Sequence, residues 1–517
     1  MKKLQILFAS ALVAFGVTSC DMEKFPYDSL EESTYMTTLN DFANARVGLY
    51  SYYRSLTTGG FVLAPEIQCD AFHAVAGFSN AYGNQYRWDF QPSDGSVESI
   101  WASYYAHISR ANYFIDSYQK ALEGDGGEFT TKDLKVLGAY AAEAYFTRAY
   151  GYLHLAGYFC EAYDTLTAHQ KLGVPLQITY APSSDASTYL GRATLQATYE
   201  QIMSDIKQAE SLVAPTLILT SNQNKLNYIS KDVVTALKAR VALQMQDYKT
   251  AATAATSLIK TGKYPLVGTV EEYRRMWVND EGPEVMWQIY MSPDELGSAT
   301  GSTFWGQYSA DSSTMKMDYI PSQKLLDLYD EDNDIRFPVF FAPFELKVST
   351  GASGMIYAFN KYPGNPNLYA SLSTDNHFTN MSKPFRIAEQ YLIASEAYLG
   401  MNDLDKAGDY LNRLKSKRIE GFQSASYSDP VILLNAIKSE RQRELVGEGF
   451  RLTDLKRWKE GMKRENAYQD KSLVLYPGLE TTTALSKDAD DFRMVWPIPK
   501  AETDVNPQIK NQQNPGY

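Results

Sequence analysis

The chain has 517 residues, enough to bury one large hydrophobic core or several, and 44% of them are hydrophobic. Its formal net charge of −12 argues against nucleic acid as a partner, because phosphate binding requires a basic surface. The five histidines and three cysteines are scattered, so we expect no metal site and no cofactor. The 38 tyrosines are flat amphipathic side chains, which form protein cores or platforms for sugars and peptides.

The first residues predict an export signal. Lys2 and Lys3 form a basic start, and an apolar run follows over residues 4–17. This run is shorter than the about 20 apolar residues that a membrane-spanning helix needs. We therefore expect residues 1–19 to be removed as a signal peptide.

A cysteine stands where the exported chain would be cut. Cys20 follows the sequence VTS, and this stretch resembles the bacterial lipobox, in which the cysteine receives lipid. An ordinary signal peptide cleaved after Ser19 is the alternative. We predict lipidation of Cys20, which would anchor the protein to a membrane through its acyl chains. The polar residues after it predict a lipid-anchored linker over 20–33.

Helical periodicity runs through the expected mature domain, residues 34–517. It predicts helices within residues 39–54, 97–122, 132–163, 195–213 and 230–262. Residues 242–251 also align without a gap with residues 398–407, sharing Leu, Met, Asp and Ala at matching positions. A repeated helix–turn–helix unit of this kind is typical of tetratricopeptide-type hairpins, which stack to bury their apolar faces. The fold class is therefore mainly α, a tetratricopeptide-type helical hairpin scaffold with large loop-rich insertions.

Two segments interrupt the helical pattern. Residues 59–91, which contain AVAGFSNAYGNQYRWDF, lack a sustained period, and residues 280–384 are rich in Gly and Ser. Binding sites favour loops held on a rigid scaffold, so we expect both to be ligand-binding insertions.

The four prolines of residues 496–517 predict an extended C-terminal tail. Cys69 and Cys160 either form a disulfide or remain two buried free thiols.

A dense charge pattern occupies residues 440–458, where opposite charges stand three or four residues apart. Two glutamates could supply an acid and a base to an enzyme. We favour a structural role, in which ion pairs lock the last helices and the tail together.

Asp330, Asp332 and Asp334 match the start of a calcium loop, but its glycine and last glutamate are missing, so we expect a turn.

The charged stretch ERQRELVGEGFRLTDLKRW and the final WPIPKAETDVNPQIKNQQNPGY resemble the SusD/RagB family of outer-membrane nutrient-binding lipoproteins. Further stretches, among them IWASYYAHISRANYFID and PFRIAEQYLIASEAYL, look similar to family segments in the same order. The resemblance covers essentially the whole mature chain. The stretch LAGYFCEAYDTLTAHQKLGVPL departs from the family by inserting residues near Cys160.

The resemblance implies a protein that is not an enzyme and sits at the cell surface, lipid-anchored to the outer membrane. Its ligand would be an oligosaccharide or polysaccharide, and its partner a SusC-like TonB-dependent barrel transporter. A relative that captures peptides is the first alternative. A secreted glycoside hydrolase is the second, since a catalytic carboxylate pair is defined by its spacing in space rather than in sequence. No GxSxG, P-loop or HExxH motif occurs.

No family motif fixes the ligand contacts, so composition selects the candidates. We predict ligand-binding residues that combine aromatic planes with polar partners in the two insertions. They are Asp70, Tyr82, Asn84, Tyr86 and Trp88 in the first insertion, and Phe304, Trp305 and Tyr308 in the second. Local packing is the alternative role of each aromatic residue. Trp101, Trp287 and Trp458 lie on helical or charged patterns, so we assign them to the core.

Overall fold

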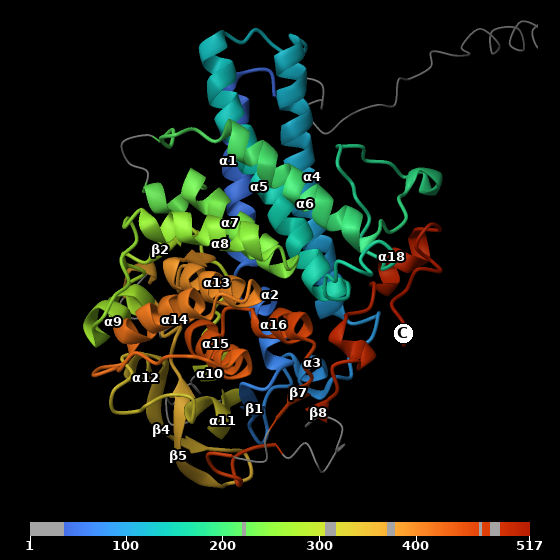
Figure 1. Cartoon of the computed structure of the whole chain (residues 1–517). Helices are drawn as coiled ribbons and strands as arrows, with labels where there is room; N and C mark the ends of the chain where they lie inside the picture. The colour runs from blue at the N-terminus through green and yellow to red at the C-terminus, as the bar shows by residue number, and fades with distance from the viewer. Residues whose placement is uncertain (1–35, 220–223, 306–316, 370–377, 465–467, 476–485) are drawn as a thin grey trace, which may run out of the picture.

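Helices form about half of the molecule, and the strands are few and short (Figure 1). The computed structural model describes residues 36–219, 224–305, 317–369, 378–464, 468–475 and 486–517. The predicted signal peptide, Cys20, the linker and Tyr308 lie outside these ranges. No helix in the described ranges is both long and apolar enough to cross a membrane.

Helices of 13 or more residues build the scaffold in the described ranges, and eight of them precede residue 430. They are α1 (Leu39–Leu56), α4 (Gly95–Glu123), α5 (Thr131–Phe159), α6 (Leu195–Leu212), α7 (Lys231–Gln244), α8 (Tyr248–Lys260), α13 (Ile387–Gly400) and α14 (Leu404–Arg418). Two more follow, α15 (Pro430–Leu445) and α16 (Arg451–Trp458). The predicted helical segments are therefore confirmed, although α5 ends at Phe159 rather than at residue 163.

Polar caps fix where these helices begin. Thr38 and Asp41 form a reciprocal capping box at the start of α1, and Thr130 and Asp133 form another at the start of α5. Each box satisfies backbone N–H groups that the first helical turn leaves unpaired. Helix α4 ends at Gly124, whose positive φ of 79° suits a residue without a side chain.

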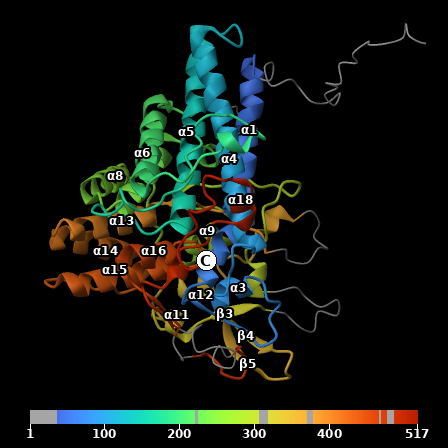
Figure 2. The same cartoon turned by 90° about the vertical axis from the view of Figure 1, so that its right-hand side faces the viewer.

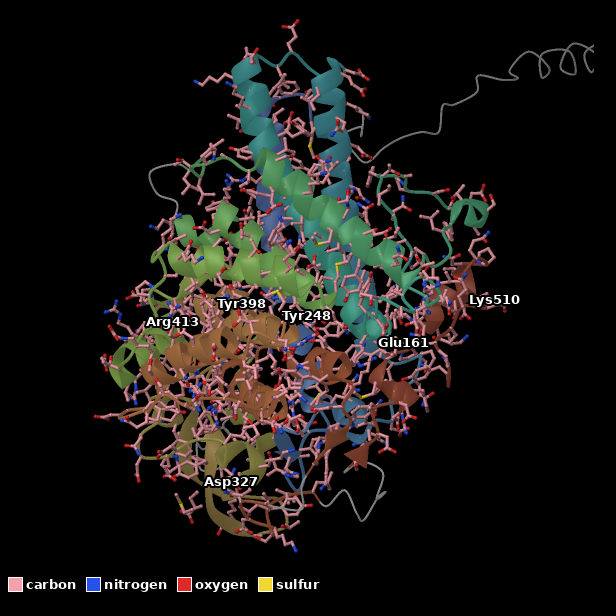
Figure 3. The ribbon with its side chains drawn as sticks, viewed as in Figure 1. Glu161, Tyr248, Asp327, Tyr398, Arg413 and Lys510 are labelled. Carbon is pink, nitrogen blue, oxygen red and sulfur yellow. The ribbon has the colours of Figure 1, made fainter. Side chains whose placement is uncertain are left out.

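The sequence repeat corresponds to two helical hairpins, α7–α8 and α13–α14, which confirms the tetratricopeptide-type scaffold. Asp247 and Asp403 cap the second helix of each, and the residues before them, Gln246 and Asn402, share a φ of 60°. Helix α8, which carries the Tyr248 labelled in Figure 3, packs on α13. The Tyr248 ring lies against Gly400, where a Cβ would approach it to 2.5 Å. The hairpins thus stack and bury their apolar faces against each other.

Short helices and strands fill the two predicted insertions. Residues 59–91 contain α2 (Gly60–Ile67), β1 (Phe72–Ala74) and α3 (Gly83–Arg87). The second insertion contains β2 (Val285–Trp287), α10 (Ser302–Trp305), β3 (Tyr319–Pro321), α11 (Gln323–Leu326), α12 (Phe337–Phe340), β4 (Phe341–Lys347) and β5 (Ser353–Phe359). These elements are too short for a periodicity to develop in the sequence, so the segments resembled loops.

Paired strands join these elements. Strands β4 and β5 form an antiparallel hairpin at the bottom of Figure 1, far from the upper ends of α4 and α5. Strand β2 pairs with β6 (Phe385–Arg386), so the second insertion leaves and rejoins the scaffold at neighbouring points. Strand β7 (Met462–Lys463) pairs with β8 (Ser486–Lys487). Helix α9 (Val270–Val278) packs on α12 and links the scaffold to the second insertion.

The C-terminal tail is not fully extended as predicted, because α18 (Lys500–Val505) forms within it. Pro499 serves as the N-cap of this helix, a position where the missing N–H costs nothing. Trp101 of α4 donates a hydrogen bond to Glu502 of α18 (Nε1–Oε2, 3.3 Å), and Figure 2 shows α18 beside α4. Trp496 stacks on Tyr158 with ring centroids 5.2 Å apart, so the tail covers the end of α5.

Both described cysteines are free. Cys69 and Cys160 are buried, and the Cys69 thiol donates a hydrogen bond to the carbonyl oxygen of Pro65 (3.2 Å). Burial raises the pKa of both thiols, which keeps them protonated. Of the two alternatives, the pair of buried free thiols is confirmed.

Candidate functional site

Antiparallel pairing of β1 with β3 brings the two predicted insertions together. Phe72 lies opposite Pro321, and Ala74 lies opposite Tyr319. Just beyond the paired strands, Asp318 accepts hydrogen bonds from the backbone N–H and the hydroxyl of Ser79 (2.5 and 2.8 Å). Segments more than 200 residues apart in the chain therefore form one local structure.

Half-buried aromatic residues and polar groups surround this junction. We call this set the loop face, and it comprises Phe78, Ser79, Asn80, Tyr82, Asn84, Arg87, Trp305 and Asp318. The Asp318 backbone N–H bonds to the Thr303 carbonyl oxygen in α10 (3.2 Å), two residues before Trp305. The Asp318 carboxylate thus faces the first insertion while its backbone holds the second.

The rings of the loop face are fixed by packing. Phe78 packs edge-on against Tyr319 with centroids 5.7 Å apart. Tyr82 covers Gly60, where a Cβ would stand 3.3 Å from the ring. Burial, together with the nearby Asp318 carboxylate, raises the pKa of Tyr82, so its hydroxyl stays protonated and can donate. Trp305 packs edge-on against Phe344 with centroids 5.8 Å apart.

The polar side chains of the loop face are oriented by one another. Arg87 donates to Asn80 (Nη1–Oδ1, 2.8 Å) and to Asn84 (Nη2–Oδ1, 3.1 Å). The Asn84 amide donates in turn to Asp94 (3.1 Å). These planar groups present donors and acceptors in fixed directions, which is what recognition of several hydroxyl groups requires.

Of the predicted site residues, the structure brings Tyr82, Asn84 and Trp305 to the loop face. The rings of Tyr86, Trp88 and Phe304 are at most 1% exposed, and their contacts are internal. Trp88 donates from Nε1 to the Gln68 carbonyl oxygen (2.7 Å), and Phe304 packs on Phe72 with centroids 4.7 Å apart. Local packing accounts for these three rings, which have no surface to offer a ligand in this conformation.

Asp70 is also internal. Its carboxylate accepts two hydrogen bonds from Arg451 and one from Lys324. Burial alone would raise the pKa of Asp70, but the two cations outweigh burial and hold the pKa well below its usual range. Asp70 is therefore a buried ionic partner of α16 rather than an open acceptor.

The sequence alone could not distinguish the predicted residues that reach the loop face from those that are buried. Five loop-face residues were missed, although all but the last belong to the quoted aromatic stretch: Phe78, Ser79, Asn80, Arg87 and Asp318. Of the tryptophans assigned to the core, Trp101 and Trp287 are buried, whereas Trp458 is half-buried.

The charged stretch of α15 and α16 is a buried ionic network. Glu444 accepts hydrogen bonds from Arg336, Arg386 and Arg418 at 2.7–3.2 Å, and all four side chains are buried. Burial alone would raise the pKa of Glu440, but Arg336 outweighs it and lowers the pKa to about 2. Neither glutamate can act as an acid near neutral pH. The network joins α15 to Arg336 of the second insertion, to Arg386 of β6 and to Arg418 of α14. Arg441 of α15 also pairs with Asp454 of α16, which confirms the predicted link between the last helices. Among the described residues, no ion pair joins α15 or α16 to residues 496–517, so the predicted lock on the tail is wrong.

The Asp330–Asp334 stretch forms the expected turn. The Asp334 carboxylate accepts two side-chain hydrogen bonds from Arg336 at 2.8 and 2.9 Å. In the part of the chain that the structure describes, no group of three or more His, Cys, Asp or Glu side chains could hold a metal ion.

The stacked helical hairpins and the inserted loop face define a helical-repeat scaffold with loop-rich insertions. The model of the SusD family matches residues 346–517, and a second model, described as starch-binding and associating with the outer membrane, matches residues 30–243. Together these ranges cover more than half of the chain. The protein belongs to the SusD family.

Known proteins similar to this chain agree with that assignment. SusD-like proteins P38 and P2 of Formosa agariphila are 23% and 25% identical to it, over its full length and at least 99% of their own. A SusD superfamily protein from Bacteroides thetaiotaomicron superposes with a TM-score of 0.76 at 26% identity, covering 93% of this chain and all of that one. A putative sugar binding protein from Bacteroides vulgatus gives 0.73 at 24% identity, covering 94% and 100%.

Proposed function

We propose that this protein captures an oligosaccharide or polysaccharide at the cell surface and delivers it to a SusC-like TonB-dependent barrel transporter, without cleaving it. The loop face is the observation that carries the proposal, because half-buried aromatic rings stand there beside fixed polar groups. The family model described as starch-binding and associating with the outer membrane supports both the ligand class and the location.

The chemistry of a sugar suits these groups. The C–H face of a pyranose ring packs on an aromatic plane, and Tyr82 and Trp305 offer partly exposed rings. Its hydroxyl groups both donate and accept, so they pair with the Asp318 carboxylate, the Asn80 amide and the Arg87 guanidinium. Capture requires only these contacts, and the buried, arginine-paired glutamates of α15 supply no catalytic acid.

The lipid anchor at Cys20 remains part of the proposal. Two or more acyl chains hold a protein stably on a membrane. Confinement beside a transporter raises the effective concentration of captured ligand, so weak contacts at the loop face suffice. Delivery then follows from proximity rather than from high affinity.

Native affinity electrophoresis tests the ligand class. The domain from residue 21 onward is run through gels that contain soluble starch, xylan, pectin or mannan, and products are assayed in parallel. Retardation by one glycan without released sugar supports the proposal. Binding of a tryptic protein digest with no retardation by any glycan would favour the peptide-capturing alternative, and released sugar would establish a glycoside hydrolase.

A further inference from the structure

A cleft of about 600 Å³ opens between α1, α5, the segment around η3 (Lys225–Asn227) and the segment after β2. Four tyrosines and three asparagines line it, and we call it the tyrosine cleft: Tyr50, Tyr140, Tyr228, Tyr290, Asn44, Asn224 and Asn227. None of these residues belongs to the loop face. The volume lies within the roughly 300–1,000 Å³ of pockets that hold small ligands.

The wall of the tyrosine cleft is rigid. The Arg46 guanidinium lies between the rings of Tyr140 and Tyr228, 4.4 and 4.5 Å from their centroids. Two hydrogen bonds of 2.6 Å tie Arg46 to the buried Glu143. The Tyr50 hydroxyl accepts a hydrogen bond from the Ile229 backbone N–H (2.9 Å). A ligand would therefore meet side chains that are already ordered, which lowers the entropic cost of binding.

The charges of this wall are compensated. Arg46 is paired with Glu143, and Arg54 is paired with Glu295 at 2.5 Å. No net charge is left to attract an ion, so the lining suits an uncharged ligand. A charged ligand would have to compete with these ion pairs.

Within the described part of the chain, one amide oxygen without a partner and one exposed tyrosine ring remain in the cleft. The Asn227 side-chain oxygen is buried without a hydrogen-bond partner among the described residues, although it borders the cleft. A buried acceptor of this kind is costly unless a donor reaches it. Tyr290 is 49% exposed at the same cleft, so much of its ring is open to a ligand. An aromatic plane and this amide oxygen together match a sugar ring with its hydroxyls.

We propose that the tyrosine cleft is a second carbohydrate-binding site, which holds a short uncharged oligosaccharide segment with Tyr290 as the stacking platform and Asn227 as an acceptor. The inference rests on the proposed function for its ligand class. It goes further by assigning a separate site, so that one long glycan or two short ones could engage the protein.

Calorimetric titration tests this site. The probes are neutral oligosaccharides cut from whichever polysaccharide retards the protein, or maltoheptaose if none does. Tyr290→Ala should weaken binding about three- to tenfold or remove one binding event, because a stacking contact of this size is lost. Tyr290→Phe keeps the ring and should retain most of the affinity. Tyr189→Ala removes a half-buried tyrosine outside both sites and serves as the matched control.

The outcomes separate this inference from the proposed function. If a glycan binds and Tyr290→Ala matches the wild type in affinity and stoichiometry, the second site is wrong and the proposed function stands. If Tyr290→Ala weakens binding while Tyr82→Ala and Trp305→Ala do not, the ligand binds at the tyrosine cleft and binding at the loop face is ruled out. If no oligosaccharide binds at all, both are overturned.

Discussion

The buried Asp70 carboxylate forms an ion pair with the half-buried Arg451 through two hydrogen bonds of 2.8 Å, which joins the segment after α2 to the start of α16. Partners 381 residues apart in the chain are thereby fixed side by side. The pair links the first insertion, with its loop face, to the C-terminal helices.

Replacing Asp70 with Asn should lower the free energy of unfolding by about 3–5 kcal/mol, because the largely covered Arg451 charge would lose its counterion. Urea denaturation of the purified domain measures this loss. Glycan affinity of the variant that remains folded should equal that of the wild type. A large loss of affinity at unchanged stability would instead make Asp70 a ligand contact.

Titration of Glu66 should make the free energy of unfolding depend on pH. Its Oε1 accepts backbone hydrogen bonds from Gly449 and Phe450 (2.9 and 3.1 Å), while burial raises its pKa to about 7. The pKa of Glu66 is higher in the folded protein than in the unfolded chain. The stabilisation that Glu66 contributes is therefore complete below pH about 4.5 and is lost as the pH rises through 7. The wild type should therefore lose on the order of 3 kcal/mol from this residue between these pH values.

Glu66→Gln removes that titration and keeps a side-chain oxygen for the same N–H groups. Thermal unfolding at a series of pH values from 5 to 8 should show a flatter profile for this variant than for the wild type. Parallel profiles would show that another group causes the dependence.

Gly400 and Gly48 give opposite expectations for the same substitution. Gly400→Ala should destabilise the protein by about 1–3 kcal/mol, because the new Cβ meets the Tyr248 ring between the stacked hairpins. Gly48→Ala, inside α1, has nothing within 4 Å and should stabilise it by roughly 0.5–1 kcal/mol through helix propensity. Chemical denaturation of both variants measures the difference, and equal effects would contradict the close hairpin contact.

The predicted lipid anchor can be tested directly. Cys20→Ser should abolish incorporation of labelled palmitate and release the protein from the membrane fraction, because the sulfur that receives lipid is gone. Labelling of the variant at the wild-type level would show that Cys20 is not the anchor.

The helical scaffold could be predicted because its signals are local. The helical period, the Asp caps at 247 and 403 and the matching residues around them are all visible within short windows of sequence. Ion-pair partners were not visible, because Glu444 pairs with Arg336, Arg386 and Arg418, which precede it by 26 to 108 residues.

The candidate site was only partly predictable, because its residues also pack against partners that are distant in the chain. Tyr82 and Tyr86 are four residues apart on the same short segment, yet one is half exposed and the other is buried under Arg464, 3.9 Å from its ring centroid. Composition cannot distinguish them, because burial depends on a residue 378 positions away. The tyrosine cleft assembles residues from four separate segments, so no single stretch pointed to it.

The most direct test of the central claim is the retardation of Tyr82→Ala and Trp305→Ala in native gels containing the glycan that retards the wild type. Trp458→Ala, which alters a half-buried tryptophan outside the loop face, is the matched control once thermal unfolding has shown that all variants fold. We expect both loop-face variants to migrate faster than the wild type and the control to be retarded normally, with no sugar released. Equal retardation of all four proteins, or release of sugar, would contradict capture at the loop face.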